Sequence, residues 1–155
     1  MPECTLILTH PDDTSRRAAE LGRTLAAGDV ILLCGDVGAG KTHFARSLIQ
    51  SLLTSPQDIP SPTFTLVQTY DTTLGDVWHA DLYRLTSPDE VEELGLVDAF
   101  DTAISLIEWP DRLASLKPED ALTIELSPEA DEDARKLVAR WSAAKWDDKI
   151  SGWQT

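Results

Sequence analysis

Eight consecutive residues, Gly35 to Thr42, match the pattern G-x-x-x-x-G-K-S/T at every fixed position. Glycine adopts positive φ without a steric penalty, so a turn of this kind can curl its backbone N–H groups around a phosphate. In this pattern Lys41 reaches the β- and γ-phosphates and the Thr42 hydroxyl ligates Mg²⁺. The residues therefore predict a site for a nucleoside triphosphate with Mg²⁺. The expected contacts come from Gly35, Val37, Gly38, Ala39, Gly40, Lys41, Thr42 and His43.

The nucleotide is expected to be ATP. Guanine specificity usually comes with an N-K-x-D segment, but the chain contains no asparagine, and a D-x-x-G switch is absent too. A small kinase would need an acceptor site and typically an arginine-bearing lid, whereas the arginines here are scattered from Arg16 to Arg140. A kinase thus stays open as an alternative without support of its own.

The segments on either side of the glycine-rich turn are those that the motif requires. Residues 30–34 form a continuous apolar run, typical of a strand buried on both faces, and are the best candidate for the central strand. Downstream, Phe44, Leu48 and Leu52 recur at helical spacing until the pair Ser55-Pro56 ends the helix. We therefore expect the turn to connect a central strand to a helix whose N-terminus points at the bound anion.

The rest of the chain alternates between strand and helix patterns. A first strand is expected at residues 5–8, and residues 12–15 offer N-caps to a helix that carries Ala18, Leu21 and Leu25 on one face and ends at Gly28. A second helix is expected at residues 89–94. The remaining strands are expected at residues 64–70, 77–82, 103–107, 121–126 and 134–141, with residues 71–76 as a hairpin connection and a helix as the alternative for the last segment. This pattern predicts an α/β fold with a P-loop NTPase-like sheet, partly parallel with antiparallel additions, and helices on both faces.

Composition indicates one globular domain. The 155 residues are enough to close a single core without disulfides or structural metals, so we expect one P-loop ATPase domain over residues 1–141. The C-terminal tail, residues 142–155, shows no pattern that predicts its structure. Cys4 and Cys34 lack the C-x-x-C spacing of a zinc or redox site and are expected to be reduced thiols. Because no basic signal region and no long apolar run is present, the protein is expected to be soluble and cytoplasmic.

The charge of the chain limits how it can engage nucleic acid. It carries 13 basic and 27 acidic residues, a formal charge of −14, which would repel a phosphate backbone. No strong direct binding of nucleic acid is therefore expected. Any role in a nucleic-acid pathway would have to act through a partner protein or a small local basic patch.

Four further segments follow the turn in order: residues 61–65 (SPTFT), 79–85 (HADLYRL), 92–96 (EELGL) and 107–110 (IEWP). Together with the turn they closely resemble the bacterial TsaE family, formerly YjeE, over about residues 5–141. The resemblance implies an ATPase that works with the partner proteins TsaB and TsaD. Their common product is the threonylcarbamoyl modification of adenosine 37 (t6A) in tRNAs that read codons beginning with A.

The resemblance also implies roles for residues outside the turn. Glu108 is implied to be a Mg²⁺ ligand beside Thr42, in agreement with its place at the end of an apolar strand, where ligands of open α/β sheets gather; a surface carboxylate is the alternative. Asp81 is implied to position the attacking water or the metal; its alternatives are a structural partner of Arg84 and a backbone cap. Thr63 resembles a switch residue that senses the γ-phosphate and Mg²⁺, with a plain Ser-Pro turn as the alternative.

Other positions are assigned less directly. The family places its adenine contacts near positions that correspond here to Asp13 and Arg135, and an arginine can stack on a base through its guanidinium plane; a merely exposed arginine is the alternative. The family commonly has a second threonine where this chain has His43. That change keeps the backbone N–H but removes a side-chain contact near the α-phosphate. His79 is expected to be structural, with a catalytic role as the alternative, and Trp109 is expected to pack in the core, with packing on the partner as the alternative.

These observations combine into one functional hypothesis. The chain is expected to be a Mg²⁺-dependent P-loop ATPase with weak turnover of its own, whose nucleotide state matters mainly to a partner complex. Lys41, Asp81 and Thr63 are the expected catalytic residues, and no residue is a candidate covalent nucleophile. Two alternatives stay open, a small-molecule kinase and a nucleotide-gated binding subunit that does not hydrolyse ATP.

Overall fold

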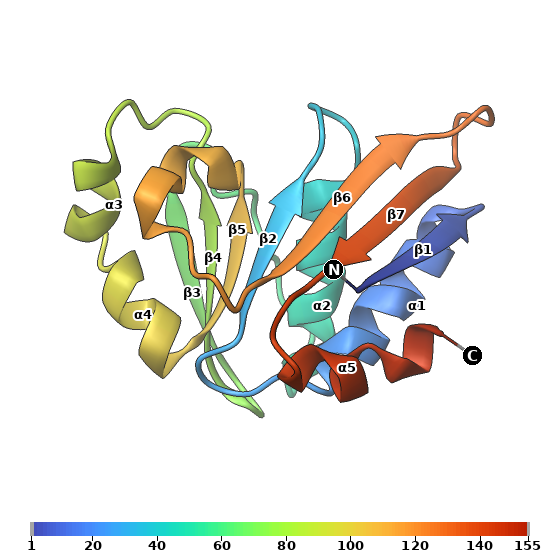
Figure 1. The fold of residues 1–155 in the computed structure, drawn as a ribbon, viewed down its shortest axis with the longest axis horizontal. Coiled ribbons are helices and arrows are strands. Elements are labelled where there is room, and N and C mark those ends of the chain that lie inside the picture. The colour runs from blue at the N-terminus through green and yellow to red at the C-terminus, as the bar shows by residue number, and fades with distance from the viewer. Residues whose placement is uncertain (1, 155) are drawn as a thin grey trace.

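A computed structural model of the chain describes residues 2–154 and shows a mixed α/β arrangement (Figure 1). The elements follow one another as β1 (Glu3–Leu8), α1 (Pro11–Gly22), β2 (Val30–Cys34), α2 (Lys41–Leu52), β3 (Val67–Thr72), β4 (Gly75–Asp81), α3 (Pro88–Glu93), α4 (Leu96–Thr102), β5 (Ile104–Glu108), the 3-10 helix η1 (Pro110–Leu116), β6 (Leu122–Pro128), β7 (Arg135–Arg140), α5 (Lys145–Lys149) and the 3-10 turn η2 (Ser151–Trp153). Among residues 2–154, no helix is long and apolar enough to cross a bilayer.

The strands form one seven-stranded sheet in the order β1-β7-β6-β2-β5-β4-β3. The four inner strands β6, β2, β5 and β4 are parallel, while β7 and β1 at one edge and β3 at the other add antiparallel pairs. The predicted central strand is confirmed, since β2 lies between β5 and β6. The predicted fold class, a partly parallel sheet with antiparallel additions, is confirmed as well.

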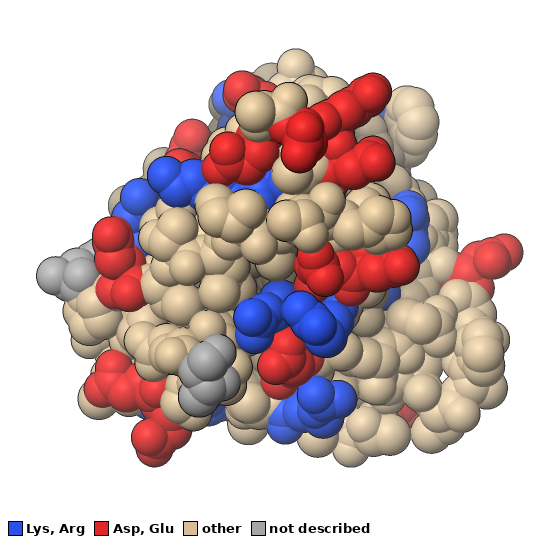
Figure 2. Space-filling model, turned by 90° about the vertical axis from the view of Figure 1, so that its right-hand side faces the viewer, with Lys and Arg blue, Asp and Glu red and all other residues tan. Residues whose placement is uncertain are grey.

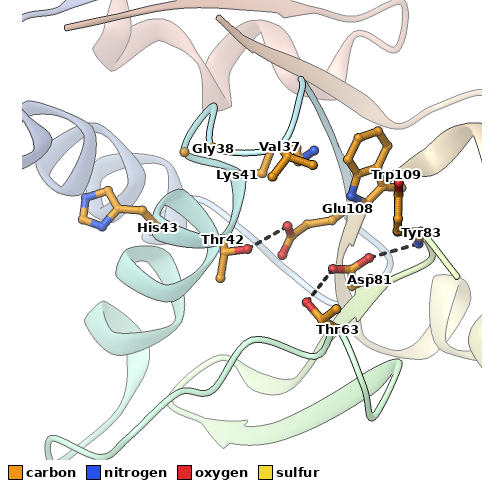
Figure 3. Close-up of a pocket in the computed structure, with 11 residues that line it drawn as sticks. Val37, Gly38, Lys41, Thr42, His43, Thr63, Asp81, Tyr83, Glu108 and Trp109 are labelled. Carbon is orange, nitrogen blue, oxygen red and sulfur yellow. Dashed lines mark hydrogen bonds between the residues drawn. The ribbon is translucent and has the colours of Figure 1, made fainter. Parts of the chain in front are cut away.

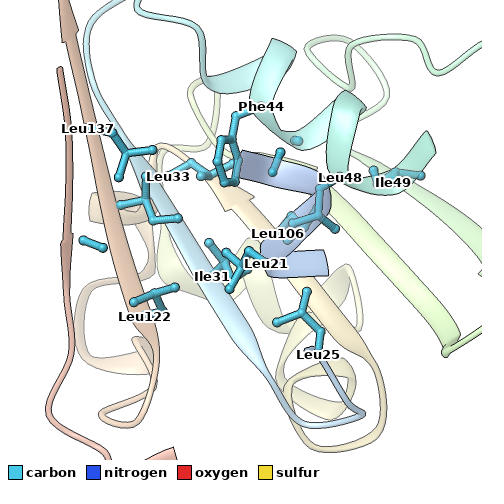
Figure 4. Close-up of a cluster of buried hydrophobic side chains, with 14 of the residues drawn as sticks. Leu21, Leu25, Ile31, Leu33, Phe44, Leu48, Ile49, Leu106, Leu122 and Leu137 are labelled. Atoms are coloured by element: carbon cyan, nitrogen blue, oxygen red, sulfur yellow. The ribbon is translucent and has the colours of Figure 1, made fainter. Parts of the chain in front are cut away.

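Helices cover both faces of the sheet, as predicted. The side chains of β2 point alternately to the two faces and pack there in two separate hydrophobic clusters. Ile31 and Leu33 pack with α1 and α2 in the larger cluster, part of which is drawn in Figure 4. Val30 and Leu32 pack in the second cluster, to which α3, α4 and η1 contribute. Burial on both faces explains the uninterrupted apolar run of this strand. The glycine-rich turn, which begins directly after Cys34, therefore starts at the carboxyl end of the central strand.

The helix α1 differs from its predicted limits at both ends. Its N-cap is His10, whose Nδ1 accepts from the backbone N–H of Asp12 at 3.1 Å, and Pro11 occupies the first helical position. Proline is favoured there because its missing N–H would have no helical partner. The helix ends at Gly22 rather than at Gly28, and Leu25 is buried from the following loop. Apolar spacing alone could not show that Leu25 reaches the core without being helical.

The β3–β4 hairpin also differs from the expectation. Residues 71–76 were predicted to be its connection, but Asp71 pairs with Asp76 and Thr72 with Gly75, so the turn consists of residues 73 and 74. The first strand begins at Val67 instead of residue 64, because Leu66 has a φ of 69° and ends a turn that starts at Pro62. The segment 61–66 therefore lies outside the sheet, as a loop beside the glycine-rich turn.

The C-terminal tail, for which the sequence predicts nothing, forms α5 and η2 and packs against the larger cluster. Trp146, Ile150 and Trp153 are buried there, and the Trp153 ring meets the Phe44 ring of α2 edge-on at a centroid distance of 6.3 Å. Lys145 and Lys149 both pair with the buried Asp29 just before β2. Burial acts to raise the pKa of Asp29, but the hydrogen bonds from the two lysines outweigh it and hold the pKa below its ordinary value.

Candidate functional site

The glycine-rich turn connects β2 to α2 at the carboxyl end of the sheet, near the top of Figure 1. Gly40 is the N-cap of α2 with a φ of 106°, so the first turn of the helix opens toward the space that the turn encloses. Gly35 has a φ of 142°, and a Cβ there would lie 2.5 Å from the carbonyl oxygen of Leu126. Both positions therefore require glycine, and the sequence pattern and the backbone agree.

Around the turn lies a cavity of about 390 Å³ (Figure 3). Most of the predicted site residues line it, namely Val37, Gly38, Gly40, Lys41, Thr42, His43, Thr63, Asp81 and Glu108. Two further residues line the cavity: Tyr83, which the sequence did not predict there, and Trp109, which was expected in the core. Trp109 is instead half-buried at the cavity, where its ring lies 4.8 Å from that of Tyr83, and a φ of 58° turns it out of β5.

Lys41 is the one lysine or arginine among the residues that line the cavity. Its side chain is 5% exposed; Nζ donates to the carbonyl oxygen of Gly35 and lies 3.4 Å from the centroid of the Trp109 ring. Burial lowers the pKa of Lys41, although the carboxylates of Glu108 and Asp81 act to raise it. The ammonium is thus poorly solvated, and an anion in the cavity would stabilise it.

Thr42 and Glu108 join the turn to the end of β5. The Thr42 hydroxyl donates to Oε1 of Glu108 at 2.8 Å, and the other carboxylate oxygen, Oε2, lies 2.7 Å from Nε2 of His79. Glu108 is 2% exposed, so both carboxylate oxygens are held by neighbouring side chains and not by solvent. A hydroxyl and a carboxylate side by side are hard oxygen donors of the kind that Mg²⁺ prefers. Their arrangement fits a Mg²⁺ ion at the turn.

Asp81 connects β4 to the loop 61–66. Its Oδ2 accepts from the Thr63 hydroxyl at 3.2 Å, and its Oδ1 accepts from the backbone N–H of Tyr83 at 3.0 Å. Of the two structural alternatives for Asp81, the backbone cap is present, whereas Arg84 lies over the Phe64 ring at 5.6 Å. Figure 3 shows Thr42, Glu108, Asp81 and Thr63 turned toward one another. The structure thus brings together the expected metal and catalytic residues, whose roles stay predictions.

The residues expected near the adenine, Asp13 and Arg135, do not line the cavity, although the pairing of Arg135 with Leu8 and the bonds of Asp13 to Thr9 bring both toward the same end of β1. His43 points toward α1, where its Nε2 lies 3.1 Å from the carbonyl oxygen of Pro11. Asp13 does not line the cavity; it accepts from the hydroxyl and the backbone N–H of Thr9, and these hydrogen bonds hold its pKa below the ordinary value. Arg135 donates to carbonyl oxygens of the turn itself, at Ala39 (3.2 Å) and Gly38 (3.4 Å). The adenine contacts of Asp13 and Arg135 stay predictions.

The contacts of Arg135 give a test of its role. If Arg135 supports the turn, Arg135→Ala should weaken the binding of ATP and of inorganic tripolyphosphate alike, by about tenfold, because two charge-assisted hydrogen bonds to the turn are lost. If Arg135 stacks on adenine, only the affinity for ATP should fall. Isothermal titration calorimetry with both ligands decides between the two, and Arg140→Ala, at the other end of β7, serves as the matched control.

The fold and the site together define a P-loop nucleotide-binding protein: a central parallel strand, a glycine-rich turn with its lysine and threonine, and a helix that begins at that turn. Within this class the chain belongs to the TsaE family. The family model described as "Threonylcarbamoyl adenosine biosynthesis protein TsaE" matches residues 8–137. This confirms the family that the sequence motifs resemble.

Individual relatives agree with the assignment. The tRNA threonylcarbamoyladenosine biosynthesis protein TsaE of Rickettsia felis is 40% identical over 78% of this chain and 71% of its own length. The protein of the same name from Aquifex aeolicus is 39% identical over 85% of this chain and 92% of its own. The crystal structure of YdiB from Bacillus subtilis superposes with a TM-score of 0.79, covering 99% of this chain and 95% of that one. At 24% sequence identity this last likeness supports the fold alone.

Proposed function

We propose that this protein is a Mg²⁺-dependent ATPase that acts with TsaB- and TsaD-type partners in the threonylcarbamoyl modification of adenosine 37 in tRNA. The observation that carries the proposal is the convergence of Lys41, Thr42, Glu108 and Asp81 on one cavity at the carboxyl ends of β2, β5 and β4. Membership of the TsaE family and the names of its relatives support the pathway.

The residues of the cavity would divide the chemistry of γ-phosphate hydrolysis among them. The backbone N–H groups of the turn and the Lys41 ammonium would hold the β- and γ-phosphates, and would stabilise the charge of the transition state. Thr42 and Glu108 would hold Mg²⁺, which would supply positive charge against the negative charge of the phosphates. Asp81 would orient the attacking water, and its hydrogen bond to Thr63 would link the loop 61–66 to the state of the γ-phosphate.

The metal role can be tested through Glu108. Glu108→Ala should raise the Mg²⁺ concentration needed for half-maximal activity by about tenfold, yet leave ATP binding in place, because octahedral Mg²⁺ keeps several waters and phosphate ligands. Glu125→Ala, which removes an exposed glutamate of β6, should leave the titration unchanged. If the titration of Glu108→Ala also stays unchanged, Glu108 is not at the metal and Asp81 takes that role.

Charge supports a role through protein partners. Figure 2 shows one face of the molecule, on which acidic side chains stand in several groups with basic ones between them. Several basic side chains of the protein are ion-paired: Arg140 with Glu3 and Glu125, and Lys145 with Asp29. Near the cavity, by contrast, Val37 and Phe64 each expose 82% of their surface, in the turn and beside Thr63. Exposed apolar groups at the cavity are consistent with a protein docking there.

The experiment that tests the proposed function follows both phosphate and partners. The protein, a TsaB–TsaD assembly and γ-labelled ATP are combined, and size-exclusion chromatography is run with ATP, with ADP and without nucleotide. We expect release of labelled phosphate into water, faster with the assembly, and co-elution that depends on the nucleotide. Transfer of label to a metabolite would support a kinase, and nucleotide-dependent co-elution without phosphate release would support a gate. Submicromolar binding to isolated tRNA would contradict the proposed route through partners.

A further inference from the structure

His79 is buried within the sheet and makes its hydrogen bond to Glu108. Its side chain is 0% exposed, in the middle of β4 between β3 and β5. Nε2 lies 2.7 Å from Oε2 of Glu108, while Nδ1, also buried, has no hydrogen-bond partner among residues 2–154. A polar ring in this position, with one nitrogen unsatisfied, costs stability that an apolar side chain would not cost.

The partners of the ring identify which nitrogen donates. An ionised carboxylate accepts hydrogen bonds only, so the bond to Oε2 requires the proton on Nε2. The neighbouring nitrogen can then remain an empty acceptor, which leaves no buried N–H without a partner. The two oxygens of Glu108 are therefore divided: Oε2 is held by His79 from β4, and Oε1 faces the Thr42 hydroxyl at the start of α2.

We propose that His79 is a positioning residue for Mg²⁺: it holds the Glu108 carboxylate by Oε2, so that Oε1 is presented to the metal beside Thr42. This inference rests on the proposed function, in which Thr42 and Glu108 serve Mg²⁺. Groups that orient a ligating side chain through a hydrogen bond typically change metal affinity by about 10–100-fold when they are removed. His79 does not line the cavity, so it acts through Glu108 and not on the nucleotide.

Two substitutions of equal length separate donation from packing. His79→Gln places an amide N–H as many bonds from Cα as Nε2 of histidine, whereas His79→Met has similar bulk without a donor. Calorimetric ATP titrations over a series of Mg²⁺ concentrations are the readout, beside the thermal unfolding midpoint of each variant. His79→Met should raise the Mg²⁺ concentration at half-maximal tightening of ATP binding by about tenfold or more, with metal-free affinity unchanged, and His79→Gln should recover most of the shift.

A double-mutant cycle with Glu108→Ala tests whether the effect passes through that carboxylate. In the Glu108→Ala background, His79→Met should cause no further shift. Two results would overturn the positioning role and leave the proposed function intact. In the first, the shifts of the two substitutions are additive. In the second, Glu108→Ala shifts the Mg²⁺ titration but His79→Met titrates like the wild type. If Glu108→Ala leaves the Mg²⁺ titration unchanged, Glu108 does not hold the metal, and both that role and the positioning role of His79 are overturned.

A measurement on the unmodified protein covers the case in which the His79 variants do not fold. The ¹⁵N chemical shifts of a histidine ring report which nitrogen carries the proton. For His79 at neutral pH we expect the proton on Nε2. A proton on Nδ1 alone would leave Nε2 unable to donate to Glu108 and would overturn the inference.

Discussion

Replacing Lys41 by alanine is expected to abolish ATP hydrolysis and to weaken binding of the triphosphate by about 100-fold or more. Lys41 is the one lysine or arginine that lines the described cavity, and its ammonium is nearly buried, so no neighbouring cation can substitute for it. Calorimetric titration with ATP and a phosphate-release assay measure the two effects. Lys136→Ala, an exposed lysine of β7, is the matched control and should retain both affinity and turnover.

The fold of the Lys41→Ala variant should survive. Burial lowers the pKa of Lys41, which means that the folded protein without ligand disfavours the charged form of this side chain. Removing the charge relieves that cost, while the contacts with Trp109 and the Gly35 carbonyl are lost, so we expect a thermal unfolding midpoint close to that of the wild type. Unchanged ATP affinity and turnover would contradict the assignment of the turn as the nucleotide site.

Ending the chain after Ser142 should largely unfold the protein at 25 °C. The truncation removes Trp146, Ile150 and Trp153 from the larger cluster and leaves the buried Asp29 without its two lysines. Emptying the site of one buried tryptophan typically costs about 3–5 kcal/mol, against a total stability of about 5–15 kcal/mol for a domain of this kind. An unpaired buried carboxylate adds to that cost. Urea unfolding followed by circular dichroism measures the loss.

A shorter truncation provides the control for this result. Ending the chain after Trp153 removes only residues 154 and 155 and should leave the urea midpoint nearly unchanged. The single substitution Trp153→Ala should fall between the two, because it removes the contact with Phe44 but keeps Trp146 and the pairing of Asp29. A chain ending at Ser142 with the wild-type midpoint would show that the tail does not belong to the cooperative unit.

The sequence was most informative where one residue pattern has one structural solution. The apolar run before the turn predicted a central strand, and β2 is that strand: it lies between two parallel neighbours, and its residues from Val30 to Leu33 are buried. The sequence was less informative where tertiary contacts determine the local structure. Helix α4 went unpredicted; its N-cap, Gly95, has a positive φ and no capping side chain. The structure of the tail could not be predicted for a similar reason, because Trp146 and Trp153 become core residues only by packing against α1 and α2.

In the candidate site, too, some residues were predicted from the sequence and others were not. The motif located the residues around Lys41, and the family resemblance located Asp81 and Glu108, which the structure places at the same cavity. The hydrogen-bond partners of these residues could not be predicted from the sequence. His79 lies two positions before Asp81, so sequence indicates that the two share one face of a strand, but the contact with Glu108 arises from the pairing of β4 with β5. The bonds of Arg135 to the turn likewise join residues almost 100 positions apart.

The central place of β2 also determines how the two sides of the cavity can move. The glycine-rich turn, on one side of the cavity, follows β2, which is hydrogen-bonded to a strand on each side. The amide protons of β2 should therefore exchange with solvent only when the whole domain unfolds. The loop 61–66 is not a strand of the sheet and is tied to Asp81 at the end of β4, through the Thr63 hydroxyl and through the carbonyl oxygen of Leu66, which accepts from the backbone N–H of Asp81. Its amides should exchange through small local openings. One wall of the cavity is thus as durable as the fold itself, while the opposite wall can be remodelled without disturbing the sheet.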